Sequence, residues 1–222
     1  MPYRVTERGE RRRREMRVRI LDAARRLFEE RGYRATSLRD VVDLAGTSIG
    51  NCYFYFASKE ALLRAVVERA SEELGPVIDR AMASVPPPAR AGVAVYTGLT
   101  WILERPGLAR LVLLEAPEAG PRELAVGHFT ERVRRFMAES PQILRGQPPE
   151  LVAEAWMGAI FHVLQAAVTG LVQAPPRHVA RFAAEWNLAA LRLPPPAMEA
   201  AMAGLDAFVS AQEEGGHDRQ HP

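Results

Sequence analysis

The chain has 222 residues, of which 48% are hydrophobic and 25% are charged, a composition typical of a globular protein with one or two domains. Its single cysteine, Cys52, excludes an intrachain disulfide, so we expect the reducing environment of the cytoplasm. The arginine-rich N-terminus lacks the apolar core of a secretory signal, and no run of about 18 uncharged apolar residues predicts a membrane span. We therefore expect no membrane partner.

The charge is distributed unevenly along the chain. Residues 1–70 carry fifteen Arg and one Lys against ten acidic residues, a net charge of +6. Residues 71–222 have a net charge of −4, which gives +2 for the whole chain. A basic N-terminal part joined to a mildly acidic remainder favours a polyanion-binding domain attached to a part with a different task.

The first predicted helix runs from about residue 13 to 31, after a polar segment, residues 1–12, that we expect to be a flexible arm. Apolar residues recur at helical spacing through it, and Gly32 supplies the left-handed residue that ends it. The run Arg11–Arg14 is interpreted either as a basic arm that contacts phosphates or as the solvated start of this helix.

Two short helices and a longer one follow the first. Ser37 caps the second helix, with Asp40 as its box-like partner, and Gly46 makes the turn into the third. Thr47 or Ser48 caps the third helix, and Ser58 caps the fourth. Two short helices joined by a tight turn are typical of the helix-turn-helix device that reads DNA.

The remaining sequence predicts further helices and no sheet, because period-two alternation is absent. Gly75-Pro76 and the prolines at 86–88 predict breaks. The helices are expected near 77–84, 88–105, 106–115, 121–139, 149–173, 176–193 and 196–213. We predict an all-α fold with a helix-turn-helix DNA-binding domain over 1–70, a helical ligand-binding and dimerisation domain over 71–213, and a disordered tail over 214–222.

Three stretches within residues 16–65 resemble the tetracycline-repressor (TetR) family of transcriptional regulators. They read ILDAARRLFEERGYRATS (20–37), VVDLAGTSIGN (41–51) and YFYFASKEALL (53–63). One departure is Cys52, where such proteins usually have a larger apolar residue, although a small thiol can pack there. The rest of the chain shows only an all-helical pattern, which agrees with the variable C-terminal domains of that family.

The resemblance implies that the third helix enters the major groove and that a dimer mate reads the adjacent half-site of a palindromic operator. Asn51 would pair with adenine, Ile49 or Thr47 would meet a thymine methyl, and hydroxyls and Lys59 would contact phosphates. An alternative for Tyr53 and Phe56 is partial burial in the core, and Arg39 could be merely solvated. The implied DNA-binding residues are Ser37, Arg39, Thr47, Ser48, Ile49, Gly50, Asn51, Tyr53, Tyr55 and Lys59.

The C-terminal body is interpreted as a sensor and a dimer interface. The apolar helix 149–173 and the helix 176–193 are the candidates for pairing with a second copy as a four-helix bundle. A small-molecule effector pocket is expected inside helices 88–173. Its candidate residues are Tyr96, Thr97, Trp101, Glu104, His128, Arg132, Trp156, His162 and Gln165. The alternative for each is an ordinary core or surface role, and for His162 a hydrogen-bonded core histidine.

The sequence therefore predicts a homodimeric regulator, a repressor that a small-molecule effector of unknown identity releases from its operator. Alternatives in the same class are an activator, or a regulator controlled by a protein partner or by oxidation of Cys52. A different class is a helical ligand-binding or oligomerisation protein without DNA binding. No enzyme, cofactor or metal site is expected, because the sequence has no phosphate-binding glycine loop, no nucleophile elbow and no metal-ligand spacing.

Overall fold

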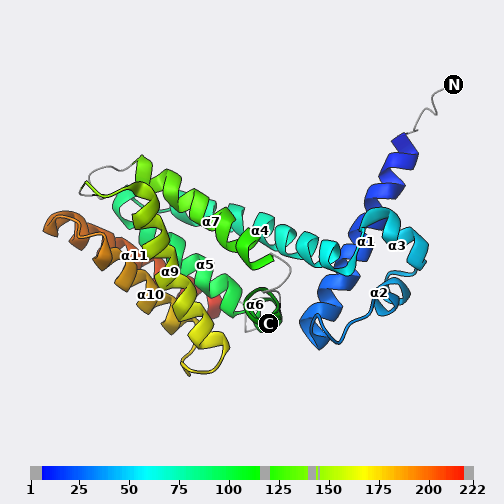
Figure 1. Cartoon of the computed structure of the whole chain (residues 1–222). Helices are drawn as coiled ribbons and strands as arrows, with labels where there is room; N and C mark the ends of the chain where they lie inside the picture. Colours follow the sequence, from blue (N-terminus) through cyan, green and yellow to red (C-terminus); the bar gives the residue numbers. More distant parts are fainter. Residues whose placement is uncertain (1–6, 116–120, 140–143, 145, 218–222) are drawn as a thin grey trace. The chain divides into compact units, whose positions relative to one another are not determined.

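The computed structural model describes residues 7–115, 121–139, 144 and 146–217 (Figure 1). Its regular elements over these residues are all helical, which confirms the predicted all-α fold. The helices are α1 (Glu7–Arg31), α2 (Leu38–Ala45), α3 (Ile49–Tyr55), α4 (Lys59–Ala83), a 3₁₀ turn η1 (Pro87–Ala89), α5 (Arg90–Leu103), α6 (Pro106–Arg110), a π-helix η2 (Leu111–Glu115), α7 (Pro121–Ala138), α9 (Pro149–Val168), α10 (Pro176–Ala190) and α11 (Pro195–His217).

The chain forms two compact units. The first contains Met1–Ala70 together with Pro106–Ala125, and the second contains Ser71–Arg105 together with Val126–Pro222. Since α4 runs from Lys59 to Ala83, its N-terminal part belongs to the first unit and its C-terminal part to the second. The helix-turn-helix motif lies wholly in the first unit.

The core of the first unit is built by α1, α2 and the start of α4. Its buried apolar side chains recur at helical spacing, as the sequence predicts; they are Ile20, Leu21, Ala24, Leu27, Phe28, Val41, Val42, Ala45, Leu62, Leu63, Val66 and Val67. The segment α6–η2 also belongs to this unit, because α6 packs on α1 and the Glu115 carboxylate accepts a hydrogen bond of 2.5 Å from the backbone N–H of Tyr33.

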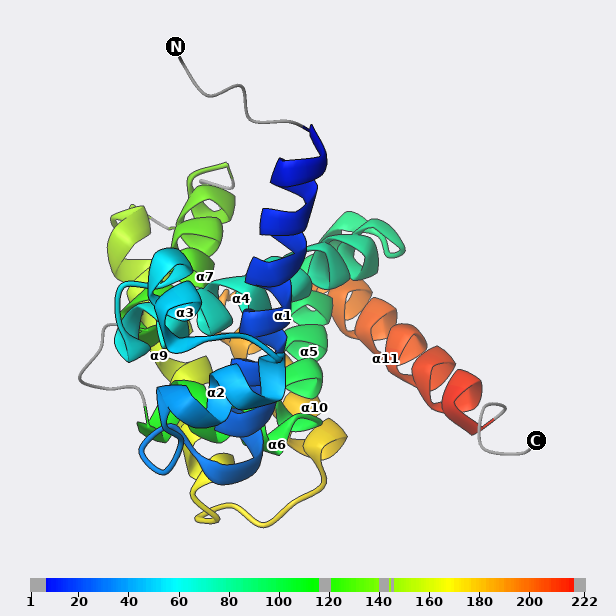
Figure 2. The ribbon, with the colours of Figure 1, turned by 90° about the vertical axis from the view of Figure 1, so that its right-hand side faces the viewer.

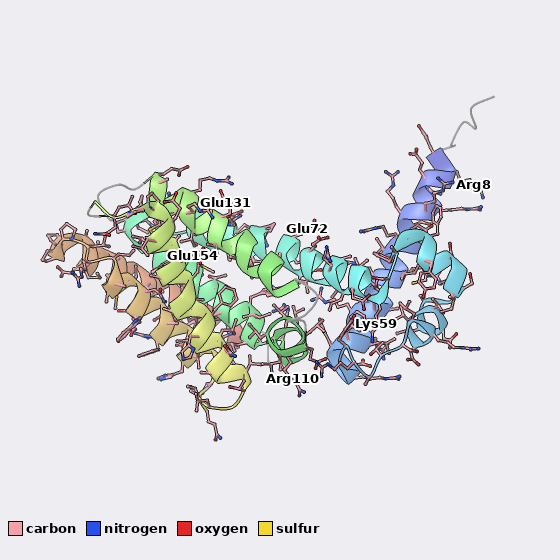
Figure 3. All side chains as sticks on the ribbon, in the orientation of Figure 1. Arg8, Lys59, Glu72, Arg110, Glu131 and Glu154 are labelled. Carbon is pink, nitrogen blue, oxygen red and sulfur yellow. The ribbon has the colours of Figure 1, made fainter. Side chains whose placement is uncertain are left out.

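Helix α1 begins at Glu7, so residues 7–12 are helical rather than part of the arm expected from the sequence. The acidic residues Glu7 and Glu10 lie in the first turn, where a negative charge favours the positive end of the helix dipole. Arg11 and Glu15 add an i,i+4 pair one turn later. The arginines of this segment are exposed, as Arg8 illustrates in Figure 3.

Helix α4 continues through Gly75-Pro76, where the sequence predicted a break. Pro76 removes one helical hydrogen bond and is itself exposed. Leu74 and Ile78 on either side of it are both buried, so the apolar face of the helix runs on without interruption. Packing of that face keeps the helix continuous despite the proline.

The core of the second unit centres on α5 and α10, which lie side by side (Figures 1 and 2). A Cβ added to Gly92 of α5 would come within 2.6 Å of Leu188 Cδ1, so the two helices approach closely where α5 has no side chain. Helix α11 packs on η1, α5 and α10, and it extends to His217, so residues 214–217 are helical rather than part of the expected tail.

Helix α9 ends at Val168, earlier than expected, because Gly170 adopts a left-handed conformation with φ of 79°. Among the described residues, α9 is the helix long and apolar enough to cross a membrane by length and composition, and 28% of that stretch is buried within the chain. A single helix of this kind is weak evidence for a membrane, since a helix that packs against protein on several sides has the same composition.

Candidate functional site

The turn between α2 and α3 is defined by local hydrogen bonds. Asp40 N–H donates to Ser37 Oγ at 3.2 Å and Ser37 N–H donates to Asp40 Oδ2 at 2.8 Å, which completes a capping box at the start of α2. Gly46 ends α2 with φ of 62°, a conformation that glycine adopts without strain. Arg19 of α1 donates to the Ala45 carbonyl at 2.5 Å and so ties this end of α2 to the core.

The start of α3 is capped by Ser48, whose Oγ accepts a 3.2 Å hydrogen bond from Asn51 N–H. Thr47, the other candidate cap, has a different role: its Oγ1 accepts a 2.7 Å hydrogen bond from the Asn51 side-chain amide. The Asn51 side chain is thereby oriented before any partner binds. A Cβ at Gly50 would meet nothing within 4 Å, so the backbone there is open on its outer side.

The residues implied by the resemblance to contact DNA all lie in the first unit. Ser37, Arg39, Ser48, Ile49, Gly50 and Tyr53 are exposed, and Thr47, Asn51, Tyr55 and Lys59 are half-buried. Tyr53 is 52% exposed, which agrees with its predicted partial burial, and Phe56 is buried. The outer side of α3 therefore presents hydroxyl, amide and aromatic groups together.

Lys59 is held in position by aromatic contact. Its Nζ lies 4.2 Å from the centroid of the Tyr33 ring. Burial lowers the pKa of Lys59, while the carboxylates of Glu60 and Asp40 act in the opposite direction. Burial, together with a 3.1 Å hydrogen bond to Glu60, raises the pKa of Tyr33 to about 12, so this hydroxyl stays protonated at neutral pH. The lysine charge is thus fixed at the edge of the helix-turn-helix surface.

One aromatic side chain of this surface was missed by the sequence reading. Phe54 is 67% exposed, meets Tyr55 edge-on, and has the Arg13 guanidinium 5.9 Å from its ring centroid. Helical spacing could have revealed it, because Gly50 and Phe54 are four residues apart and share the outer face. Arg13 of α1 thus reaches an exposed ring of α3.

Cys52 lies on the inner side of α3 with no exposed surface. Burial raises the pKa of its thiol, which disfavours the thiolate. Cysteines that sense oxidants are accessible and have a lowered pKa, so this setting opposes the redox alternative.

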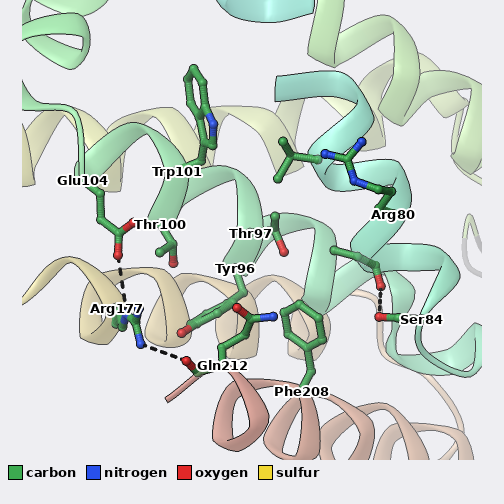
Figure 4. A pocket seen from close by; sticks show the side chains of 12 residues that line it. Arg80, Ser84, Tyr96, Thr97, Thr100, Trp101, Glu104, Arg177, Phe208 and Gln212 are labelled. Atoms are coloured by element: carbon green, nitrogen blue, oxygen red, sulfur yellow. Dashed lines mark hydrogen bonds and ion pairs between the residues drawn. The ribbon is translucent and has the colours of Figure 1, made fainter. Parts of the chain in front are cut away.

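The second unit contains a pocket of about 370 Å³ bordered by α4, α5, α10 and α11 (Figure 4). Its lining residues are Val77, Arg80, Ala81, Ser84, Tyr96, Thr97, Thr100, Trp101, Glu104, Arg177, Phe208 and Gln212. Four of the predicted pocket residues are brought together here: Tyr96, Thr97, Trp101 and Glu104.

The other predicted pocket residues lie elsewhere. Arg132 pairs with Asp79, and Trp156 is buried with its Nε1–H donating to the Asn187 carbonyl at 3.0 Å. His162 and Gln165 are exposed on α9, so the core interpretation of His162 is wrong for the single chain. The side chain of His128 lies outside the described residues.

The pocket combines aromatic rings, hydroxyls and charges. The Tyr96 ring meets Phe208 edge-on with centroids 6.2 Å apart, and Arg177 Nε lies 3.5 Å from Glu104 Oε1. Burial raises the pKa of the Tyr96 hydroxyl; the carboxylates of Glu213 and Glu104 act in the same direction, and Arg177 and the Thr100 hydroxyl act against it. This is the mixture of apolar surface and a few polar groups that small-molecule sites use.

The residues that complete this pocket were only partly visible in the sequence. Thr100 lies one turn from Thr97 and Glu104 on α5, so helical spacing could have found it. The contributions of α10 and α11 arise from tertiary packing and left no local signal. Over the described residues, no group of three His, Cys, Asp or Glu side chains could hold a metal ion.

Comparison with known proteins supports the helix-turn-helix assignment. Residues 20–66 match the model of the bacterial regulatory proteins, tetR family. An uncharacterized HTH-type transcriptional regulator of Mycobacterium tuberculosis is 38% identical over 103 residues, which are 46% of this chain and 51% of that protein. The transcriptional repressor KstR2 of Rhodococcus jostii is 41% identical over 58 residues, 26% of this chain and 28% of that protein.

Solved structures resemble the whole fold. The fatty acid degradation regulator FadR from Bacillus halodurans has a TM-score of 0.67 at 17% identity and covers 78% of this chain and 94% of its own. RolR, solved in complex with resorcinol, has a TM-score of 0.63 at 22% identity and covers 86% of this chain and 95% of its own. At these identities the likeness concerns the fold alone.

Residues 20–66 are therefore similar, in sequence as well as in fold, to the helix-turn-helix domain of bacterial transcriptional regulators. The resemblance to the TetR family that the sequence predicts is confirmed over these residues. The chain spans about half the length of the curated relatives of Mycobacterium tuberculosis that it matches.

Proposed function

We propose that this protein is a cytoplasmic, homodimeric repressor that binds a palindromic operator and is released from it by a small-molecule effector. The observation that carries the proposal is the outer side of α3. There Ser48, Gly50 and Tyr53 are exposed, and the half-buried Asn51 amide is already oriented by Thr47. A surface of this kind needs no rearrangement before it enters a major groove.

Each of these side chains has a defined role in this proposal. Asn51 reads adenine, and the Ile49 side chain meets a thymine methyl. The remaining contacts, from Ser37, Arg39, Tyr53, Tyr55 and Lys59, go to phosphates or groove edges and set the orientation of the domain. Operator affinity should fall steeply with salt, since each neutralised phosphate releases counterions.

The dimer is proposed to form through α9 and α10. Helix α9 is apolar but only 28% of its apolar stretch is buried, and Glu154 lies on its exposed side (Figure 3). On α10, Phe182 and Trp186 are 51% and 62% exposed, with their rings stacked at 6.1 Å. An exposed apolar surface of this kind favours burial against a second copy, which a palindromic operator also requires.

The effector is proposed to bind in the second unit, at the pocket that Tyr96, Thr97, Trp101 and Glu104 help to line. Two proteins of similar fold were solved with small molecules, RolR with resorcinol and the transcriptional regulator FadR from Bacillus subtilis with stearoyl-CoA. Those ligands belong to those proteins, but they support a sensor role for the corresponding part of this chain. An effector that binds the DNA-free state more tightly would lower operator affinity.

Selection of binding sites from random and genomic DNA with the purified chain tests the proposal. We expect a palindromic site, bound by two or more subunits in even number and lost as salt rises. A protein that prefers no sequence at any salt concentration would contradict DNA reading by α3.

The interface is tested by Trp186→Glu combined with Phe182→Glu, which should convert the dimer into a monomer in sedimentation experiments. Val18→Glu, a change at another exposed apolar residue of the first unit, is the matched control and should leave the dimer intact. A dimer that persists in the double variant would place the interface elsewhere.

A further inference from the structure

The pocket of the second unit contains three buried hydroxyl oxygens without a hydrogen-bond partner among the described residues. They are Tyr96 Oη, Thr97 Oγ1 and Thr100 Oγ1, and all three belong to α5 and line the pocket. Only 2% of Tyr96 is exposed. The Thr100 hydroxyl is near enough to influence the Tyr96 pKa, yet the two form no hydrogen bond of normal geometry.

Buried polar groups in proteins are almost always hydrogen-bonded, so three unpaired hydroxyls in one cavity indicate a ligand that pairs with them. A hydroxyl both donates and accepts, so its best partner is a neutral hydroxyl or carbonyl group. Burial raises the pKa of Tyr96, so its hydroxyl stays protonated and can donate to such a group.

The remaining walls define the rest of the ligand. Trp101 and Phe208 contribute ring surfaces, and the volume of about 370 Å³ is at the small end for ligand sites. The pocket therefore suits a compact ring system and does not suit a long acyl chain.

The charges at the pocket indicate an anionic substituent. In Figure 4, Arg177 and Glu104 lie on one side of the threonines and Arg80 lies on the other. Arg177 is paired with Glu104, whereas the Arg80 side chain is exposed and has no ion-pair partner among the described residues. The charged residues that line the pocket are two arginines and one glutamate, and Arg80 is the arginine without a carboxylate partner among the described residues.

From these features we infer that the effector is a compact hydroxylated aromatic carboxylate, with its hydroxyl or carbonyl oxygen at Tyr96, Thr97 and Thr100 and its carboxylate toward Arg80. This inference rests on the proposed function, because it assigns the effector class to the same pocket. Thr100 and Arg80 are determinants that the sequence reading did not include.

The test measures binding directly by titration calorimetry on the full chain without DNA. The probes are 4-hydroxybenzoate and 4-hydroxycinnamate, their analogues without the hydroxyl, their neutral amides, resorcinol, and stearoyl-CoA. We expect a hydroxylated carboxylate to bind best, and the loss of either group to weaken binding about tenfold.

The decisive variant combines Thr97→Val with Thr100→Val, which keeps the shape of both side chains and removes both hydroxyls. It should bind the hydroxylated probe about tenfold more weakly and the probe without the hydroxyl equally well. The ligand-free variant should melt at a higher temperature than the wild type, since two unpaired buried hydroxyls are gone. A merely structural role of these threonines would lower both the melting temperature and the affinity.

Thr130→Val is the matched control. Thr130 is also buried with an unpaired hydroxyl, but it does not line the pocket. Its replacement should raise the melting temperature without changing affinity. Arg80→Gln should weaken the binding of the carboxylate probes and leave the affinity for the amide probes unchanged.

Three outcomes would overturn the inference. The first is that no hydroxylated aromatic carboxylate binds, and the second is that stearoyl-CoA or the neutral resorcinol binds most tightly. The third is that the valine variant and the wild type bind the hydroxylated probe with equal affinity. Operator binding by the same preparation separates the two levels. If the protein binds its operator but none of these probes, only the inferred effector class is contradicted. If it prefers no DNA sequence, the proposed function itself is contradicted.

Discussion

The α2–α3 surface of the first unit and the pocket of the second unit are organised in opposite ways. Around the turn, polar groups find their partners within four residues, as Ser37 does with Asp40 and Thr47 with Asn51. At the pocket, the lining comes from two pairs of helices that are far apart in the sequence, α4 with α5 and α10 with α11, and buried hydroxyls of α5 stay unpaired among the described residues.

The difference shows how each surface meets its partner. The side chains proposed to face DNA are fixed by local hydrogen bonds, so their arrangement is present in the free protein and its ordering on binding costs little. The pocket is held by tertiary packing and has buried hydroxyls without a partner among the described residues. The hydrogen bonds of the first surface are complete within the free chain, whereas those of the second are not.

Leu188→Ala should have the largest effect and tests whether tertiary packing holds the pocket scaffold. Leu188 is fully buried and fills the space beside Gly92 between α10 and α5. We expect a loss of about 2–5 kcal/mol in the free energy of unfolding, measured by urea denaturation. The control Val18→Ala, at an exposed position, should change it by less than about 0.5 kcal/mol. Equal effects of the two changes would show that α5–α10 packing is not the main support.

Asn51→Ala tests the preformed surface. We expect a loss of about 1–3 kcal/mol in discrimination between the selected operator and sites altered at the adenine, measured by competition binding. Lys59→Ala should instead weaken binding to all DNA sequences to a similar extent. Should Asn51→Ala reduce affinity uniformly on every sequence, base reading by this residue would be ruled out.

Ser37→Ala tests the local capping box and should cost about 1 kcal/mol of stability. The hydrogen bond from the Ser37 side chain lowers the pKa of Asp40, followed by the bond from the Ser37 backbone. Because this carboxyl has a lower pKa in the folded state, it stabilises the fold above its ordinary pKa, and this contribution disappears as the pH falls through the lowered value. Thermal melts below about pH 4 should therefore depend less on pH in the variant than in the wild type. Identical pH profiles would contradict the coupling of the two side chains.

The smallest effect is expected at Cys52. Because its thiol is buried and its pKa is raised, mild peroxide should leave operator affinity unchanged, and a thiol reagent should react slowly with the native protein. Loss of DNA binding after peroxide, prevented by Cys52→Ala, would restore oxidation as a control mechanism.

The same contrast between local bonds and tertiary packing explains which features could be predicted from the sequence. The ends of α2 and α3 could be read from Ser37, Gly46 and Ser48, because caps and left-handed glycines act within a few residues. The break expected at Pro76 did not form, because a local signal was outweighed by the buried face of α4.

At the pocket, the residues on α5 could be predicted from helical spacing, but Arg177 and Phe208 could not, since tertiary packing brings their helices there. His162 is instructive in a different way. It lies on a helix with apolar residues on every side, so periodicity gives no indication of which side faces the core.

The composition of the first unit has a consequence for engineering and for the exchange of DNA-reading heads during evolution. A chimera that joins residues 1–70 to a foreign body leaves behind α6 and η2. Tyr33 N–H then loses the Glu115 carboxylate, and the backbone of Glu29 loses the close contact with Gly107. A transplantable head must carry both 1–70 and the segment from Pro106 to Glu115. Exchange by recombination would therefore need two separate insertions of coding sequence, so a single crossover after residue 70 transfers the recognition helix without all of its support.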